Sequence, residues 1–181
     1  MKGILFTELL EMAEERWGLA LVDRALVASE LPHGGAYTSV GTYGHGEFLR
    51  VVDELGRAVG LSRSEFLSDY GRHLFARLLG AYPQVQGPAT VFEFLQDLDG
   101  YVHLEVLKLY PDARPPRLSW QLEGPDRLVL LYESHRPLAD LARGLLAGCI
   151  AHFGEDIALQ TEDLSGGQGT RARFVLERRS P

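Results

Sequence analysis

Residues 127–164 read RLVLLYESHRPLADLARGLLAGCIAHFGEDIALQTEDL, and the order of patterns within this stretch decides the fold class. The segments 127–136 and 156–164 are predicted to be strands. Between them, residues 137–154 have the pattern of an apolar helix that begins at Pro137 and ends at Gly154. The C-terminal part of the chain is therefore predicted to contain a helix inserted between strands.

The pattern outside this stretch completes the prediction of an α+β fold. Two further strands are predicted at 117–123 and 170–179, and the turns GPD and SGGQG fit hairpins. Upstream, helical spacing predicts helices over 2–17, 19–30, 47–60, 62–80 and 90–110, with a Gly-rich loop at 31–46. We expect one domain: an N-terminal helical subdomain (1–85) packed on a C-terminal subdomain (86–181) with a mainly four-stranded antiparallel sheet.

Composition excludes several classes of protein. A net charge of −7 argues against nucleic-acid binding, and no apolar run approaches the roughly 20 residues of a membrane span. The N-terminus lacks the features of a signal peptide, so we expect a cytoplasmic chain with neither nucleic acid nor membrane as partner. The single cysteine, Cys149, excludes an internal disulfide and any multi-cysteine metal site, and is predicted to be a small buried apolar residue.

His103 is the first candidate functional residue. It lies in the predicted helix 90–110, shortly before a turn that contains Pro115 and Pro116. A histidine here can be an axial ligand of a metal or haem, or an ordinary helix residue paired with Asp99 one turn earlier. The position alone leaves both interpretations open.

The second candidate is the sequence YESHR at 132–136, at the end of a predicted strand. Strand alternation would place Tyr132, Ser134 and Arg136 on one side. Two hydroxyl groups and a guanidinium are the donors that a pair of carboxylates or phosphates requires. The alternative is an exposed strand end with ordinary polar residues.

Taken together, these motifs give the chain a resemblance to the haem–nitric oxide/oxygen-binding (H-NOX) family, bacterial relatives of the haem domain of soluble guanylate cyclase. The resemblance extends over essentially the whole chain, through MKGILF, GGAYTSVGTY, GRHLF, HLEVLKLYPDARPP and YESHR. It implies haem b between the two subdomains, with His103 as the axial ligand of the iron. It further implies that Tyr132, Ser134 and Arg136 hold the haem propionates and that Pro116 presses on the porphyrin.

The resemblance also carries a prediction about the gas. Oxygen-binding members have a distal tyrosine at the position of Leu141, and its supporting partners correspond to Leu9 and Leu74. Bound oxygen benefits from a hydrogen-bond donor that NO does not need, so an apolar pocket favours NO and CO and excludes oxygen. His73 and Tyr70 would overturn this prediction if either reached the pocket. The remaining apolar residues expected to line it are Ile4, Leu5, Phe75, Leu78 and Leu145.

The function implied is a gas sensor and not an enzyme. NO would weaken and break the bond between the iron and His103, and the resulting shift between subdomains would be read by a separate protein. The family's partners are histidine kinases, diguanylate cyclases or phosphodiesterases acting in trans. The alternatives are an oxygen sensor of the same fold, a haem enzyme that handles NO, and an interaction domain without haem.

Overall fold

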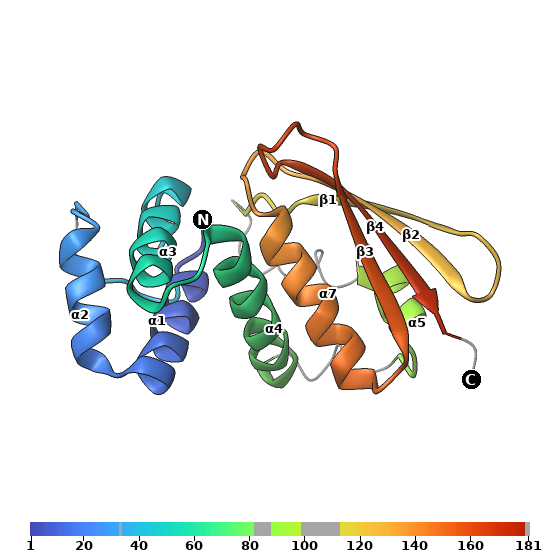
Figure 1. The fold of residues 1–181 in the computed structure, drawn as a ribbon, viewed down its shortest axis with the longest axis horizontal. Helices are drawn as coiled ribbons and strands as arrows, with labels where there is room; N and C mark the ends of the chain where they lie inside the picture. Colours follow the sequence, from blue (N-terminus) through green and yellow to red (C-terminus); the bar gives the residue numbers. More distant parts are fainter. Residues whose placement is uncertain (33, 82–87, 99–112, 180–181) are drawn as a thin grey trace. The chain divides into compact units, whose positions relative to one another are not determined.

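A computed structural model describes the chain except for residues 33, 82–87, 99–112 and 180–181 (Figure 1). The fold divides into two compact units, Met1–Tyr70 and Gly71–Pro181, and each is described by itself. Helix α4 (Arg63–Ala81) contributes to both units. Among the described residues, no helix has the length and apolar character needed to span a membrane.

The first unit is helical, as predicted. It contains α1 (Ile4–Trp17), α2 (Leu19–Ala28), α3 (His45–Val59) and the beginning of α4. The apolar face of α3 is fully buried, because its residues recur at helical spacing: Phe48, Val51, Val52 and Leu55. Gly60 ends this helix with a φ of 76°, a conformation in which glycine carries no steric penalty. Helix α3 begins two residues earlier than predicted, since Glu47 accepts a hydrogen bond from the Gly44 N–H.

The Gly-rich loop packs against the chain's first residues. Lys2 and Thr42 form an isolated antiparallel bridge, and the Gly3 N–H donates to the Gly41 carbonyl at 2.8 Å. A Cβ at Gly3 would overlap the backbone carbonyl of Thr38, so only glycine allows this approach. Two sequence motifs that lie almost 40 residues apart are therefore one structural feature, with a role in packing.

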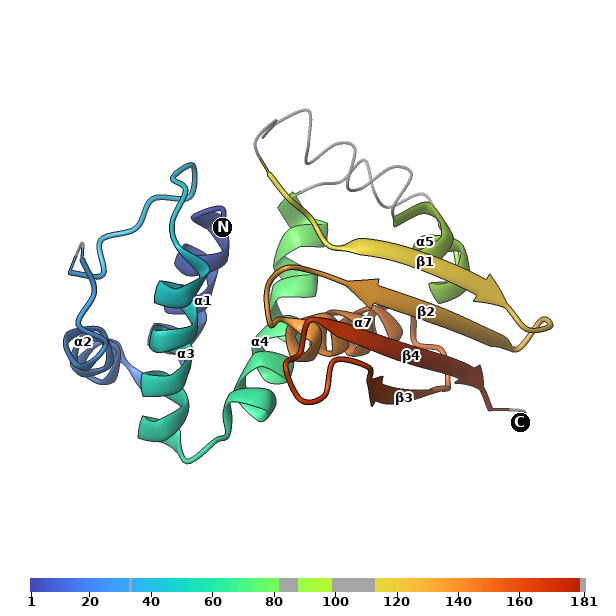
Figure 2. The same cartoon turned by 90° about the horizontal axis from the view of Figure 1, so that it is seen from above.

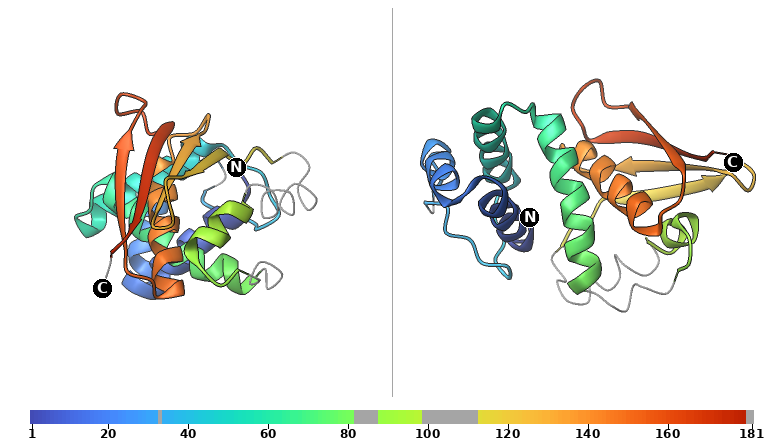
Figure 3. Two further views of the ribbon diagram at one scale, coloured as in Figure 1. Left: turned by 90° about the vertical axis from the view of Figure 1, so that its right-hand side faces the viewer. Right: turned by 60° about the horizontal axis from the view of Figure 1, so that its bottom comes forward.

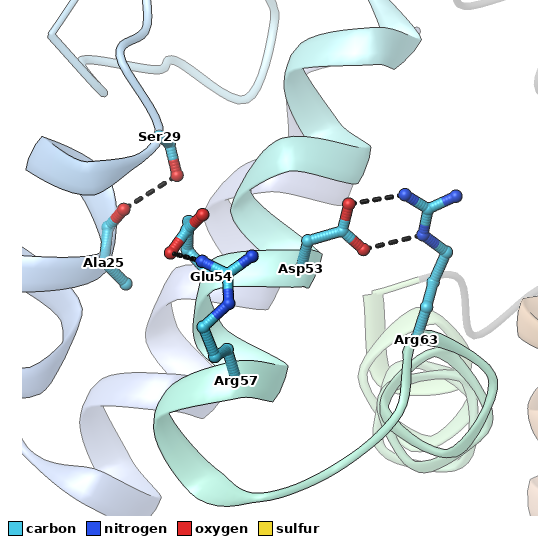
Figure 4. A network of polar contacts seen from close by, with 6 residues as sticks. All are labelled: Ala25, Ser29, Asp53, Glu54, Arg57 and Arg63. Carbon is cyan, nitrogen blue, oxygen red and sulfur yellow. Dashed lines mark hydrogen bonds and ion pairs between the residues drawn. The ribbon is translucent and has the colours of Figure 1, made fainter.

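Ion pairs and a hydrogen bond reinforce the helices of the first unit (Figure 4). Arg63, at the start of α4, grips Asp53 of α3 with two nitrogens, and the Nε to Oδ1 distance is 2.6 Å. Arg57 pairs with Glu54 within α3. At the end of α2, the Ser29 hydroxyl donates to the Ala25 carbonyl at 2.7 Å, which satisfies a carbonyl in the helix's last turn.

The second unit has a four-stranded antiparallel sheet, which confirms the predicted fold class. The strands are β1 (Arg117–Leu122), β2 (Arg127–Glu133), β3 (Ile157–Asp163) and β4 (Arg171–Arg178), in the order β1-β2-β4-β3. Helices α5 (Val91–Asp97) and α7 (Ala139–Phe153) pack on one face of this sheet (Figures 2 and 3). The core lies between them and includes Phe92, Leu130, Cys149 and Phe174. Helix α5 is the beginning of the predicted helix 90–110, and residues 99–110 of that predicted helix lie outside the described part.

Helices α4 and α7 approach each other backbone to backbone. A Cβ at Gly71 of α4 would overlap the Leu141 carbonyl oxygen and lie 2.9 Å from the Gly144 Cα. One turn further along, a Cβ at Gly148 of α7 would lie 2.7 Å from the Phe75 Cβ and 3.0 Å from the Arg72 carbonyl oxygen. Because these glycines have no side chain, the two helices can approach each other this closely.

We predict that Gly71→Ala destabilises the protein by about 1–3 kcal/mol, because the added methyl group forces the helices apart. This loss should exceed the gain of about 1 kcal/mol that alanine offers over glycine in a helix. Urea denaturation measures the difference.

Gly80→Ala is the matched control in the same helix. Gly80 is exposed and no atom of the described residues lies within 4 Å of a Cβ built there, so the variant should be as stable as the wild type or more stable. Equal effects at the two positions would contradict the proposed helix contact.

Candidate functional site

Tyr132, Ser134 and Arg136 come together at the end of β2. Tyr132 is buried on the inner face of the sheet, its ring centroid 6.4 Å from that of Phe174, and its side chain hydrogen-bonds with that of Ser134. Strand β2 ends at Glu133, so alternation does not extend to residue 136 as predicted. The chain turns instead, because the Ser134 Oγ accepts a hydrogen bond from the Arg136 backbone N–H at 3.1 Å.

Arg136 is a half-buried cation with no carboxylate partner among the described residues. Its guanidinium donates a 3.1 Å hydrogen bond to the Arg114 carbonyl oxygen. Burial lowers the pKa of Arg136 from its ordinary value, and Tyr132 partly offsets this effect. Burial likewise raises the pKa of Tyr132, which remains a neutral donor at physiological pH.

These features fit an anionic ligand. A partly desolvated guanidinium gains most from a carboxylate or phosphate, which can accept two parallel hydrogen bonds from it. The hydroxyls of Tyr132 and Ser134 lie beside it and can donate to the same group. The donor set therefore suits the propionate carboxylates of haem.

Pro116 lies at the same end of the sheet. It precedes Arg117, the first residue of β1, which pairs with Glu133 of β2. The hydrogen bond from the Arg136 guanidinium to the Arg114 carbonyl oxygen is a second contact between the segment before β1 and the segment after β2. The family resemblance predicts one site for Pro116 and Arg136, and the sheet register brings their segments together.

The sequence does not predict the anchor of helix α5. Glu155, between α7 and β3, accepts a 2.5 Å hydrogen bond from the Val91 N–H at the first turn of α5. Its other oxygen accepts from the Arg178 Nε at 3.0 Å, and the Arg178 guanidinium lies 4.3 Å from the centre of the Phe92 ring. These contacts tie α5 to the sheet immediately before the segment that contains His103. No sequence signal could have indicated this network, since its members are 23 and 64 positions from Glu155.

The apolar residues predicted for the distal pocket belong to both units. In the first unit, Leu9 of α1 is buried, while Ile4 and Leu5 are half-buried. In the second unit, Leu74 and Phe75 of α4 and Leu141 of α7 are buried, and Leu78 and Leu145 are half-buried. The α4–α7 contact brings the second group together along two adjoining helices.

Tyr70 is fully buried, and its hydroxyl is already engaged. It donates to the Leu5 carbonyl oxygen at 2.7 Å, so its one hydrogen is used within the first unit. His73 is half-buried. Cys149 is buried as predicted, and burial raises the pKa of its thiol to about 12, which keeps it protonated and unreactive.

His103 and Asp99 lie outside the described residues, as does His33. The choice between an axial ligand and an ordinary helix histidine therefore stays where the sequence left it. In the described part of the chain, no three His, Cys, Asp or Glu side chains group to hold a metal ion.

A family model described as "Haem-NO-binding" matches residues 2–161. The chain therefore belongs to the haem-NO-binding (H-NOX) family, whose members are haem-based gas sensor domains and not catalysts.

Solved H-NOX structures agree with this assignment. The unliganded Fe(II) H-NOX protein from K. algicida is 31% identical, with a TM-score of 0.92 over 100% of this chain and 98% of that chain. The H-NOX from Shewanella woodyi, solved with bound IWP-051 in the Fe(II)CO ligation state, is 34% identical, with a TM-score of 0.83 over 99% and 95%. The S. oneidensis H-NOX in the Fe(II)NO ligation state has a TM-score of 0.90 over 99% and 100% at 24% identity, which supports the fold. A comparison with curated protein sequences finds no match.

We predict that Tyr70→Phe lowers the free energy of unfolding by about 1 kcal/mol, the typical contribution of one buried hydrogen bond. The variant should leave the response to oxygen unchanged, because the Tyr70 hydroxyl already donates to Leu5. Urea denaturation and spectra of the ferrous protein in air measure the two effects. A change in oxygen binding would contradict this placement of the hydroxyl.

Proposed function

We propose that this chain is a single haem domain that senses NO and CO, excludes oxygen and passes the signal to a separate protein. The observation that supports it best is the half-buried guanidinium of Arg136 beside Tyr132 and Ser134, which has no carboxylate partner among the described residues, in a chain of the haem-NO-binding family. The haem iron supplies the atom that binds the gas. The chain's own residues would hold the haem, determine the selectivity for gases and transmit the signal.

The residues at the end of β2 would hold the cofactor at its charged edge. Arg136 can grip a propionate with two nitrogens, while the hydroxyls of Tyr132 and Ser134 donate to the carboxylates. His103 would provide the axial imidazole and Pro116 a contact with the porphyrin. We propose haem b, because one cysteine cannot make the two thioether bonds of haem c.

Selectivity for NO and CO would come from the absence of a donor near the bound gas. The side chains proposed for the distal side are apolar, and the Tyr70 hydroxyl donates its hydrogen to the Leu5 carbonyl oxygen. Bound oxygen would then lack the hydrogen bond that stabilises its partial negative charge. Relatives solved in the Fe(II)NO and Fe(II)CO ligation states support the choice of gases.

The signal would be carried by His103. Release of this residue from the iron on NO binding would free the segment that follows α5, while Glu155 and Arg178 keep α5 bound to the sheet. A partner that contacts this part of the surface would then distinguish two states of one protein. We propose a histidine kinase, a diguanylate cyclase or a phosphodiesterase as that partner, and the cytoplasm as its location.

The gas prediction is tested with spectra of the ferrous protein. The wild type should bind NO and CO and form no stable complex in air, and the spectrum with NO should be that of iron that has lost its histidine. Leu141→Tyr supplies a donor and should allow a stable complex in air. Leu141→Phe adds the same ring without the hydroxyl and should behave like the wild type. A stable oxygen complex of the wild type would contradict the proposal.

The cofactor-holding residues are tested by haem retention. His103→Gly should lose haem unless imidazole is added. Arg136→Leu should speed haem transfer to an acceptor protein by about 10- to 100-fold, the equivalent of roughly 1.5–3 kcal/mol for a charged hydrogen bond. Arg171→Leu is the matched control, since Arg171 is an exposed arginine paired with Glu133. Full haem retention by His103→Gly without imidazole would refute its role as ligand.

A further inference from the structure

The sheet of the second unit has an outer face with an apolar centre. Helices α5 and α7 pack on the inner face, where Leu130 and Phe174 belong to the core (Figure 3). Side chains alternate along a strand, so the residues between these point to the outer face. At its centre Val129 of β2 lies beside Val175 of β4, and the neighbouring Leu131 is 41% exposed. Many antiparallel sheets have one face in water, so exposure alone does not identify an interface.

The arrangement of charges around this apolar centre is more informative. At one end, Glu133 of β2 lies opposite Arg171 of β4, and the carboxylate and guanidinium are 3.3 Å apart. At the other end, Arg127 of β2 lies opposite Glu177 of β4. The acid is on β2 at one end and on β4 at the other. The four charges therefore alternate in sign around the apolar centre.

A second copy of the outer face matches this pattern. Consider a twofold axis that runs along the strands, midway between β2 and β4. It places β2 of one copy over β4 of the other and keeps each residue at the same height along the strands. Each residue of β2 then faces, in the other copy, the residue of β4 that is its neighbour in its own chain. The facing pairs, each occurring twice, are Glu133 with Arg171, Val129 with Val175, and Arg127 with Glu177.

The charge balance of this face also favours a second copy. The whole chain has a net charge of −7, so two copies repel each other over most approaches. On the outer face, strands β2, β3 and β4 carry as many arginines as glutamates: Arg127, Arg171, Arg173, Glu133, Glu162 and Glu177. We propose that two copies of this protein associate through the outer faces of their sheets, with the twofold axis along the strands. Face-to-face sheets of this kind pack about 10 Å apart with their strands roughly aligned.

A twofold axis across the strands is the alternative arrangement. It would also set acid against base, with Glu133 over Arg127 and Arg171 over Glu177. It would place Val175 over Arg173, however, and the two central valines would not meet. The axis along the strands is therefore the one that matches apolar as well as charged residues.

The proposed contact is small. Strands of about seven residues at roughly 3.3 Å per residue, spaced about 4.8 Å apart, give a face of about 400–450 Å² per copy. The total of about 900 Å² falls below the roughly 1,200 Å² of a standard stable complex, so the dimer is weak. Sedimentation equilibrium of the full chain between about 10 µM and 1 mM measures it. A wild type that is monomeric up to about 1 mM would overturn the proposal.

Charge exchange tests the axis. Glu133→Arg places arginine against Arg171 of the other copy twice and should weaken dimerisation at least 5-fold. Adding Arg171→Glu restores the opposite charges both within the chain and across the interface. Dimerisation of the double variant should return to within about twofold of the wild type. Under the axis across the strands, the double variant would instead set like charges against Arg127 and Glu177, so failure to recover overturns the proposed arrangement.

Two controls separate association from stability. Urea denaturation of both variants shows whether they fold, and the double variant keeps the cross-strand ion pair that the single variant loses. The exchange Glu54→Arg with Arg57→Glu alters an ion pair of helix α3, outside the proposed interface, and should leave dimerisation unchanged. An equal effect of this exchange would show a general dependence on charge and contradict the proposal.

The apolar centre is tested at Leu131. This residue would face Arg173 of the other copy, so Leu131→Lys sets two positive charges together and should weaken dimerisation at least 5-fold. Val40→Lys is the control, since Val40 is 72% exposed on a loop of the first unit and should leave dimerisation unchanged. A Leu131→Lys variant that dimerises like the wild type would overturn the proposal.

Discussion

Helices α4 and α7 pack backbone against backbone at Gly71, Gly144 and Gly148, and the second unit is organised around this contact. Helix α7 covers one face of the sheet, so the distance between α4 and α7 also sets the position of α4 relative to the strands. Both helices carry leucines proposed to line the gas pocket. The glycines at the helix contact therefore also affect the spacing of the leucines in the proposed gas pocket.

Burial of charge is the second constraint, at the end of β2. Removing a guanidinium from water costs free energy unless an anion or several acceptors replace the lost hydration. Among the described residues, the Arg114 carbonyl oxygen has this role for Arg136, with the Tyr132 and Ser134 hydroxyls close by. A ligand with carboxylates would complete the arrangement, which is why the propionates of haem suit it.

Much of the fold could be predicted from local patterns. Buried residues at helical spacing identified α1 and α3, and the turn glycines marked their ends, as Gly60 shows for α3. Less local features were predicted poorly. The sequence pattern predicts that strand alternation continues to Arg136. In the structure the chain turns at Ser134, because the Ser134 Oγ accepts a hydrogen bond from the Arg136 backbone N–H. The anchor of α5 on Glu155 and Arg178 was not predicted at all.

The sequence by itself determined the order of helices and strands, the antiparallel sheet and the family, because periodicity, turn residues and short motifs are properties of neighbouring positions. Only the tertiary structure decided which distant groups meet. In the structure, the first residues pack against the loop at 38–43, and the Tyr70 hydroxyl donates a hydrogen bond to the Leu5 carbonyl oxygen. The segment that contains Pro116 lies at the end of β2. Helices α5 and α7 cover one face of the sheet, and Leu131 on the other face stays exposed. The physical reason is that these contacts depend on how the elements pack, and residues far apart in the chain carry no local signal of it.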